Sequence, residues 1–249
     1  MRLIPIICLF FSLFSQAGES APPLRVGMVD EFSPMAFRVA GELQGIEVDL
    51  AHIVSERLGR PPQIDIFAFD ELIVRVADGT IDVAMSGLSV TAKRRELVEF
   101  TEPFLQVGQM AIVRVPDVQV YVKPGAMAKP GTRIGVQRGG TGEAFVRGEF
   151  KHALVTAFPG VESGLQALRD GEVDVFVHDS TTSWQLGRSF VNDNLLSLNR
   201  HLTEEKVAWA VHPASRELIT ALNLILKEIK SDGTLNEVLS RWLPEYKPI

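Results

Sequence analysis

The stretch Asp78–Val83, which reads D-G-T-I-D-V, returns later in the chain as Asp170–Val175, which reads D-G-E-V-D-V. In each copy an apolar helical stripe precedes the glycine and an apolar strand pattern follows it. A glycine at this place suits the left-handed residue that ends a helix. Two copies of the same helix–turn–strand junction predict two similar α/β units.

Strand and helix patterns alternate around both copies. Around the first copy we expect strands over 24–29, 63–67 and 81–85 and helices over 47–58 and 70–77. Around the second we expect strands over 133–137, 154–158 and 173–177 and helices over 163–169 and from 142 to about 147. The βαβαβ order predicts a mostly parallel sheet with helices on its faces in each unit. Residues 215–242 predict two further helices, broken at Asp232-Gly233, that pack back on the first unit.

Bulk composition is that of a packed globular protein. The 249 residues are 46% hydrophobic and 22% charged, which excludes a disordered chain. The formal net charge is −6, and the sequence offers no clustered Lys and Arg surface of the kind that binds nucleic acid. We therefore expect no nucleic-acid partner.

The first residues have the layout of a secretory signal peptide. A short positive start is followed by the apolar run Leu3–Phe14, and Ser15–Ala17 places small residues at a cleavage site. The run is shorter than the roughly 20 residues that span a bilayer. We expect a signal peptide over residues 1–17, with Ser20 as the latest cleavage site. The only cysteine, Cys8, lies in this segment, so the mature chain would have neither a disulfide nor a thiol nucleophile.

The repeat also predicts where a ligand binds. In open α/β sheets, ligands lie beyond the carboxyl ends of the strands. In the first unit this place holds Ser86 and Gly87, and in the second it holds His178 and Asp179. If the two units face each other, these residues meet across a cleft.

The segment Ser86–Arg94, which reads S-G-L-S-V-T-A-K-R, combines groups that suit a carboxylate. Thr91 is a good N-cap for a short helix, Ser89 supplies a hydroxyl, and Arg94 lies one turn into the helix. A guanidinium matches a carboxylate in bidentate geometry, and helix-terminal N–H groups add donors. The alternative is that Arg94 and its basic neighbours form a solvated face.

Asp179 is the natural opposite pole, because a carboxylate at a strand end can accept the ammonium group of a zwitterion. The alternative is a helix N-cap. The glycine-rich stretch 135–142 follows a strand but lacks the Lys of a phosphate loop, which leaves an anion-binding turn with the Thr141 hydroxyl. Phe32 and Phe69 are candidates for clamping a ligand, although aromatic residues more often belong to the core.

Hydrolytic and metal-dependent functions find no support in the motifs. Neither G-x-S-x-G nor H-E-x-x-H occurs, and the five histidines show no metal-ligand spacing. We expect no cofactor and no metal site.

The chain resembles the extracellular solute-binding proteins of family 3, which serve polar amino acid ABC transporters. Gly45–Leu50, which reads G-I-E-V-D-L, resembles the family's element of glycine, hydrophobic residue, acid, hydrophobic residue and Asp-Leu. Ser86–Phe104 resembles its carboxylate-binding segment, and Ser231–Thr234 followed by Trp242 resembles its C-terminal element. The resemblance runs from about Leu24 to Trp242.

This resemblance implies an α/β fold of the two-lobed, periplasmic-binding-protein-like type II, in which two hinge strands join the lobes. Lobe one would span 24–112 and 208–249, and lobe two would span 113–207. The hinges would lie near Ala111–Val115 and Lys206–Ala210.

The resemblance also assigns roles to site residues. It implies that the ligand carboxylate binds Arg94, Ser89 and Thr141. It implies that the ammonium binds Asp179, with Ser86 or the Gly87 backbone nearby. Phe32 and Phe69 match aromatic positions of the ligand pocket, and Gln137 lines its mouth in lobe two. Gly140 stands where the family commonly has Thr or Ser, which leaves the identity of the ligand open.

The implied function is a periplasmic, monomeric and non-enzymatic protein that captures a polar amino acid or similar zwitterion by hinge closure and serves a membrane ABC permease. Two alternatives remain open. One is a periplasmic enzyme like cyclohexadienyl dehydratase, which needs a general acid in the cleft, from Asp30, Glu31 or His178. The other is a sensing module whose closure signals to a membrane receptor.

Overall fold

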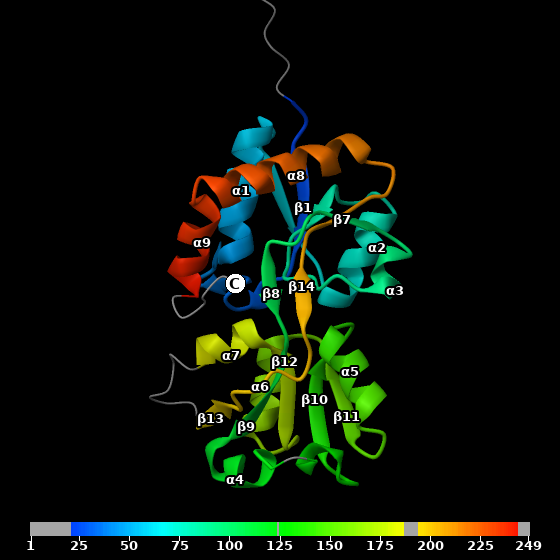
Figure 1. Ribbon diagram of the computed structural model, residues 1–249, viewed down its shortest axis with the longest axis vertical. Helices are drawn as coiled ribbons and strands as arrows, with labels where there is room; N and C mark the ends of the chain where they lie inside the picture. The colour runs from blue at the N-terminus through cyan, green and yellow to red at the C-terminus, as the bar shows by residue number, and fades with distance from the viewer. Residues whose placement is uncertain (1–20, 124, 187–193, 244–249) are drawn as a thin grey trace, which may run out of the picture.

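Two α/β lobes are stacked along the long axis of the protein and joined by β8 (Leu105–Val107) and β14 (Glu205–Val207) (Figure 1). The computed structural model describes residues 21–123, 125–186 and 194–243, so the expected signal peptide lies outside the described residues. The expected two-lobed α/β fold is confirmed. Among the helices described, none has both the length and the apolar character needed to cross a membrane.

Lobe one is built on a five-stranded sheet in the order β5-β1-β6-β15-β7. Strand β1 is parallel to β5 and β6, whereas β15 is antiparallel to β6 and β7. The strands are β1 (Leu24–Met28), β5 (Pro62–Ile66), β6 (Val83–Ala84), β7 (Glu99–Phe100) and β15 (Ala210–Val211). A small sheet adds β2 (Glu31–Phe32), β3 (Ala36–Val39) and β4 (Glu42–Gln44). The helices are α1 (Ile46–Leu58), α2 (Leu72–Ala77), α3 (Ala92–Arg95), α8 (Arg216–Ser231) and α9 (Thr234–Trp242).

Lobe two repeats this plan with the order β11-β10-β12-β9-β13. Strand β10 is parallel to β11 and β12, whereas β9 is antiparallel to β12 and β13. The strands are β9 (Gln109–Arg114), β10 (Arg133–Gln137), β11 (Leu154–Phe158), β12 (Val175–Asp179) and β13 (Leu195–Ser197). The helices are α4 (Val118–Tyr121), α5 (Thr141–Glu149), α6 (Val161–Arg169) and α7 (Ser180–Leu186).

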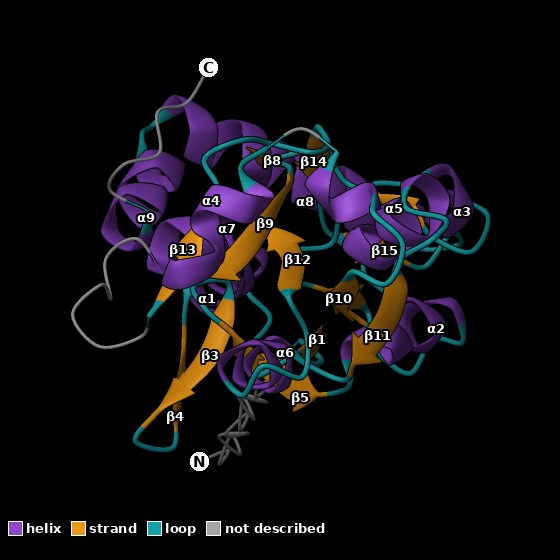
Figure 2. Cartoon of the chain, turned by 90° about the horizontal axis from the view of Figure 1, so that it is seen from below, coloured by secondary structure: helices purple, strands orange, loops and turns teal. Residues whose placement is uncertain are grey.

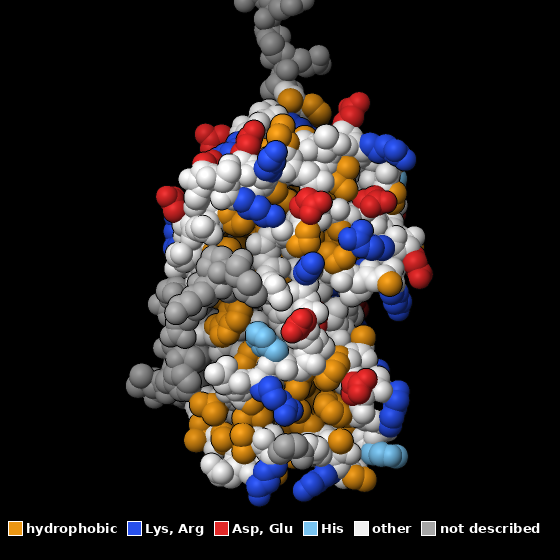
Figure 3. Space-filling model, viewed as in Figure 1, with side chains coloured by type: hydrophobic (Ala, Val, Ile, Leu, Met, Phe, Trp, Pro, Cys, Tyr) orange, Lys and Arg blue, Asp and Glu red, His pale blue; other side chains and the backbone are white. Residues whose placement is uncertain are grey.

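Helices cover both faces of the lobe-two sheet. Val175 and Val177 of β12 share a core cluster with Val146 of α5, whereas Phe176 between them packs with Leu165 of α6. This alternation places α5 and α6 on opposite faces, as Figure 2 shows from below. Figure 3 adds that apolar side chains gather on the visible face of lobe two, whereas lobe one carries charges of both signs there.

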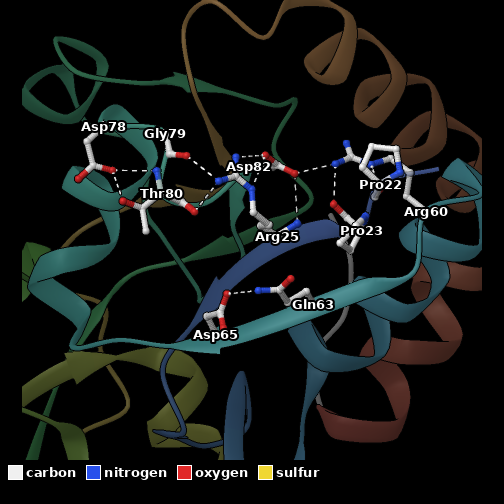
Figure 4. Close-up of polar contacts among 10 residues, drawn as sticks. All are labelled: Pro22, Pro23, Arg25, Arg60, Gln63, Asp65, Asp78, Gly79, Thr80 and Asp82. Atoms are coloured by element: carbon white, nitrogen blue, oxygen red, sulfur yellow. Dashed lines mark hydrogen bonds and ion pairs between the residues drawn. The ribbon is translucent and has the colours of Figure 1, made fainter. Parts of the chain in front are cut away.

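The repeated D-G-x-x-D-V stretch builds the same polar cluster in each lobe. Gly79 and Gly171 both have positive φ, as their helix-ending role requires. In lobe one, the Arg25 guanidinium donates to the Asp82 carboxylate and to the Gly79 carbonyl oxygen (Figure 4). In lobe two, Arg133 donates in the same way to the last aspartate of the motif and to Gly171. The repeat therefore fastens β1 to β6 in lobe one and β10 to β12 in lobe two.

The sheet registers place the first crossing between the lobes earlier than expected. Strand β9 pairs with lobe-two strands along its length, so the expected boundary between residues 112 and 113 falls inside a lobe-two strand. The chain crosses at Leu105–Gly108, not at the predicted Ala111–Val115. The second crossing, Glu205–Val207, overlaps the edge of the predicted Lys206–Ala210. A buried lobe strand and a hinge strand have the same apolar pattern, so the sequence could not separate them.

The two crossing segments touch at Gly108, because a Cβ built on this glycine would overlap the Thr203 carbonyl oxygen, just before β14. The Gly108 carbonyl oxygen also accepts a hydrogen bond of 2.8 Å from the Ser180 N–H at the start of α7. Only glycine lets the two crossing backbones come this close.

We therefore expect Gly108→Ala to destabilise the protein by about 1–3 kcal/mol, because the added methyl group must push one backbone away from the other. Urea unfolding followed by circular dichroism measures the change. Gly148→Ala is the matched control, since a Cβ there meets no atom within 4 Å. Equal unfolding midpoints for the two variants would contradict the close crossing.

Candidate functional site

A cleft between the two lobes gathers side chains from both. We call it the binding cleft, and its lobe-one lining is Phe69, Gly87, Ser89 and Arg94. Its lobe-two lining is Gln109, Gln137, Gly140, Thr141, Gly142, Val177, His178 and Asp179. Seven of the nine residues proposed from the sequence line this cleft. Ser86 and Phe32 do not.

Arg94 reaches from lobe one into the cleft. It lies on α3, where the Thr91 hydroxyl accepts a hydrogen bond of 3.1 Å from the Arg94 backbone N–H, so the predicted N-cap is confirmed. The Arg94 guanidinium donates to the carbonyl oxygens of Ser89, at 2.7 Å, and of Gly139 in lobe two, at 3.1 Å. Its neighbours Lys93 and Arg95 are exposed, whereas Arg94 is half-buried. The basic segment is therefore not a uniform solvated face.

The Arg94 guanidinium is partly buried beside two carboxyl groups and an aromatic ring. Burial lowers its pKa, and the nearby carboxylates of Asp179 and Glu205 offset part of this effect. The guanidinium carbon also lies 5.6 Å from the centre of the Phe69 ring, within the range of a cation–π contact. The group is thus a partly desolvated cation held in place on several sides, which suits recognition of a planar carboxylate.

Asp179 faces the cleft from the last position of β12 and is 7% exposed. Burial and then the charge of Glu205 raise the pKa of its carboxyl to about 7, against the opposing effects of a Gln109 hydrogen bond and of Arg94. A ligand ammonium group beside Asp179 would lower this pKa again, because an opposite charge stabilises the ionised form. The site therefore has a carboxyl group whose ionised form a cationic ligand group would stabilise.

Two residues that sequence reasoning missed connect the site to the crossing strands. The Gln109 side-chain amide donates to the Asp179 carboxylate and, at 3.0 Å, to the Thr141 hydroxyl. The Thr141 hydroxyl in turn donates to Glu205 at 2.7 Å. The only local signal for Gln109 is an amide at the start of a strand whose next four residues are apolar.

Thr141 presents its backbone to the cleft as well as its side chain. It is the first residue of α5, and the first N–H groups of a helix have no partner within the helix. Since the hydroxyl is already engaged with Gln109 and Glu205, the backbone N–H is the stronger candidate for a ligand carboxylate.

Ser86 and Phe32 stand behind the cleft. The Ser86 hydroxyl accepts a hydrogen bond of 3.1 Å from the Val29 N–H and is fully buried. The Phe32 ring packs edge-on against the His178 ring, with 4.9 Å between the ring centroids. A Cβ on Gly87 would lie 2.8 Å from the Phe32 ring. Both residues shape the wall around Gly87.

His178 is locked as a neutral side chain. Its Nδ1 lies 3.0 Å from the Thr182 hydroxyl and its Nε2 lies 3.0 Å from the Gln137 amide oxygen. Burial lowers its pKa to about 3, so at neutral pH it lacks the imidazolium proton that a general acid transfers. Asp30, another general-acid candidate, forms an ion pair of 2.7 Å with Arg38.

Glu31 is the remaining general-acid candidate. Burial, followed by the charges of Asp30 and Glu162, raises the pKa of its carboxyl, but it is not part of the cleft lining. In the part of the chain that the structure describes, no three His, Cys, Asp or Glu side chains gather to hold a metal ion.

Two α/β lobes, two crossing strands and a cleft that holds a guanidinium near a carboxyl group define a two-lobed solute-binding protein. Residues 24–245 match the family model of the bacterial extracellular solute-binding proteins, family 3. The chain belongs to this family, whose members act outside the cytoplasm.

Relatives of known name fall into two groups. The chain is 21% identical to the ABC transporter arginine-binding protein 1 of Escherichia coli K12, over 96% of this chain and 98% of that protein. It is 28% identical to the cyclohexadienyl dehydratase of Pseudomonas aeruginosa, over 72% of this chain and 70% of that protein. Among solved structures, an ancestral arginine-binding protein bound to arginine superposes with a TM-score of 0.84 at 28% identity, covering 90% of this chain and 99% of that one.

Proposed function

We propose that the protein captures a free amino acid in the periplasm by closing its two lobes and presents it to the permease of an ABC importer. The observation that carries this proposal is the placement of Arg94 on lobe one and Asp179 on lobe two around one cleft. An amino acid has a carboxylate and an ammonium group that match these two side chains. The relative from E. coli, which is named as an arginine-binding protein of an ABC transporter, supports the same role.

Capture takes place in two steps, because the lobe-one groups contact the ligand before the lobe-two groups do. The ligand carboxylate first binds the Arg94 guanidinium, beside the Ser89 backbone. Lobe two then brings the α5 N-terminus to the carboxylate and Asp179 to the ammonium. Closure removes water from the cleft, which strengthens each charge-assisted hydrogen bond. The protein is a monomer that leaves the cytoplasm through its N-terminal signal peptide.

The charges around the cleft narrow the class of ligand. Asp179 and Glu205 both act on Arg94, so two carboxyl groups surround one guanidinium. An acidic amino acid would add a further carboxylate to this set, at a cost that rises as water is excluded. We therefore propose a neutral or cationic amino acid as the ligand.

A thermal-shift screen of the mature protein against the common amino acids tests the function. Ligand at 100 times its dissociation constant adds about 2.7 kcal/mol to the stability, which raises Tm by roughly 5–10 °C for a chain of this size. A shift with one or more neutral or cationic amino acids supports the proposal. Shifts with aspartate or glutamate alone would contradict the charge argument, and no shift with any amino acid would contradict the function.

The similarity to a cyclohexadienyl dehydratase makes enzymatic activity the one competing function that an observation favours. We propose that this chain is not an enzyme, because His178 is locked as a neutral group and Asp30 is ion-paired. Incubation with prephenate and arogenate, followed by ultraviolet absorbance, tests this. Turnover of either compound would overturn it.

A further inference from the structure

Hydrogen bonds join the ends of both crossing segments to the lobe-two side of the cleft. The backbone N–H of Gln109, the first residue of β9 directly after the first crossing, donates to the Thr203 hydroxyl at 2.8 Å. The Thr203 hydroxyl donates to one carboxylate oxygen of Glu205, on the second crossing, at 2.6 Å. The other Glu205 oxygen accepts from the Thr141 hydroxyl. We call Gln109, Thr141, Asp179, Thr203 and Glu205 the hinge network.

The network closes on itself through the Gln109 side chain. Its amide nitrogen has two hydrogens, of which one goes to Thr141 and the other to the Asp179 carboxylate. Each hydroxyl in the ring accepts one bond and donates another, so the donors and acceptors match without conflict. Such a ring is stiff, because moving one member misaligns the bonds of its neighbours.

The geometry points to Gln109 and Glu205 as positioning residues, through which the orientation of the crossing strands sets the place and charge of Asp179 and hence the affinity for the ligand. This inference deepens the proposed function and rests on it. Neither residue needs to touch the ligand: Gln109 holds the Asp179 carboxylate by a direct hydrogen bond, and Glu205 holds Thr141.

The charges around Asp179 come from residues of the hinge network and from lobe one. Arg94 faces Asp179 from α3, Glu205 faces it from β14, and the neutral amide of Gln109 faces it from β9. The adjacent His178 is neutral. Glu205 raises the pKa of the Asp179 carboxyl and Arg94 lowers it. Removal of the Glu205 charge must therefore move the Asp179 titration to lower pH.

Two pairs of variants test the inference. Glu205→Gln keeps the shape of the side chain and removes its charge, and the exposed neighbour Glu204→Gln removes the same charge outside the network. Gln109→Ala removes the bond to Asp179, and Gln106→Ala changes an exposed glutamine of the crossing strand β8, which precedes β9. Circular dichroism confirms that each variant is folded.

The first readout is the titration of the Asp179 carboxyl in the free protein, followed by carbon-13 NMR. We expect the midpoint near pH 7 in the starting protein to fall in Glu205→Gln and to stay in place in Glu204→Gln. An unchanged midpoint in Glu205→Gln overturns the inference.

The second readout is the affinity for the amino acid found in the screen, measured by titration calorimetry between pH 5 and pH 9. Affinity falls as the pH drops through the Asp179 titration, because a proton competes with the ligand ammonium. We expect Glu205→Gln to move this fall to lower pH, and Gln109→Ala to weaken binding roughly tenfold or more at pH 8. Affinity within twofold of Gln106→Ala overturns the role of Gln109. If no amino acid binds the starting protein while the Asp179 titration still moves in Glu205→Gln, the hinge network stands and the proposed function fails.

Discussion

Arg94→Ala is expected to weaken amino-acid binding by about 10- to 150-fold. The substitution removes a charge-assisted hydrogen bond to the ligand carboxylate, which contributes about 1.5–3 kcal/mol, and each 1.4 kcal/mol is a factor of ten in the dissociation constant. Because the guanidinium also donates to Gly139 across the cleft, the variant loses a direct contact between the lobes. Titration calorimetry at pH 8 measures the effect.

Lys93→Ala is the matched control for Arg94→Ala. Lys93 lies on the same helix and has the same charge, but its side chain is exposed. We expect its affinity to equal that of the starting protein, since an exposed charge is screened by solvent and salt. If Arg94→Ala stayed within about threefold of this control, Arg94 could not be the carboxylate-binding group.

Asp179→Asn is expected to weaken ligand binding by about 30-fold or more and, at the same time, to stabilise the ligand-free protein at pH 8. The loss of affinity follows because truncating one partner of a buried charge pair costs about 2–5 kcal/mol. The gain in stability follows because an amide has no charge to bury, while it still accepts the hydrogen bond from Gln109.

The direction of the pH dependence follows from the raised pKa of Asp179. The folded protein holds the proton up to about pH 7, whereas the unfolded chain releases it near the ordinary value of 3.8. The folded state thus binds more protons between these values, and its stability falls as the pH rises from about 4 to about 7. Buried Glu47, whose pKa is raised to about 7, contributes a fall in the same window.

Because Glu47 is present in both the starting protein and Asp179→Asn, a difference between them reports the contribution of Asp179. Scanning calorimetry of the starting protein and of Asp179→Asn, from pH 4 to pH 8, should give Tm curves that diverge as the pH rises, with the variant more stable at pH 8. Parallel curves would mean that folding does not raise the pKa of the Asp179 carboxyl group. A variant that still binds its amino acid with unchanged affinity would remove Asp179 from the site.

Local patterns in the sequence were sufficient for most of the elements. The apolar stripe ended by Gly59 predicted the helix now found at Ile46–Leu58, and Gly59 has the left-handed conformation that ends it. The strands Arg133–Gln137 and Leu154–Phe158 have their predicted bounds. The predicted break at Asp232-Gly233 separates α8 from α9. Each of these features depends on residues that are close together in the chain, so a local sequence pattern can predict it.

Sequence patterns and the family resemblance also predicted the repeated α/β plan and most of the residues that line the cleft. The repeat determined which strand ends face the cleft, because the carboxyl ends of parallel strands meet at one edge. The same reasoning placed Ser86 in the cleft, and the family resemblance assigned Phe32 to the ligand pocket, yet these side chains lie behind Gly87. Sequence position indicates which edge of a sheet a residue reaches, but not whether its side chain forms the surface or the layer beneath it.

Where the lobes are joined, and how the site residues are held, depends on contacts between segments that are distant in the chain. Gln109 begins β9 and Glu205 begins β14, far apart in the chain, and no local pattern relates them. Their roles arise because Gly108 and Thr203 bring the two backbones into contact, which aligns the hydrogen bonds from Gln109 to Asp179 and from Thr141 to Glu205. The raised pKa of Asp179 has the same origin, since burial and a neighbouring carboxylate exist only once the lobes are folded together.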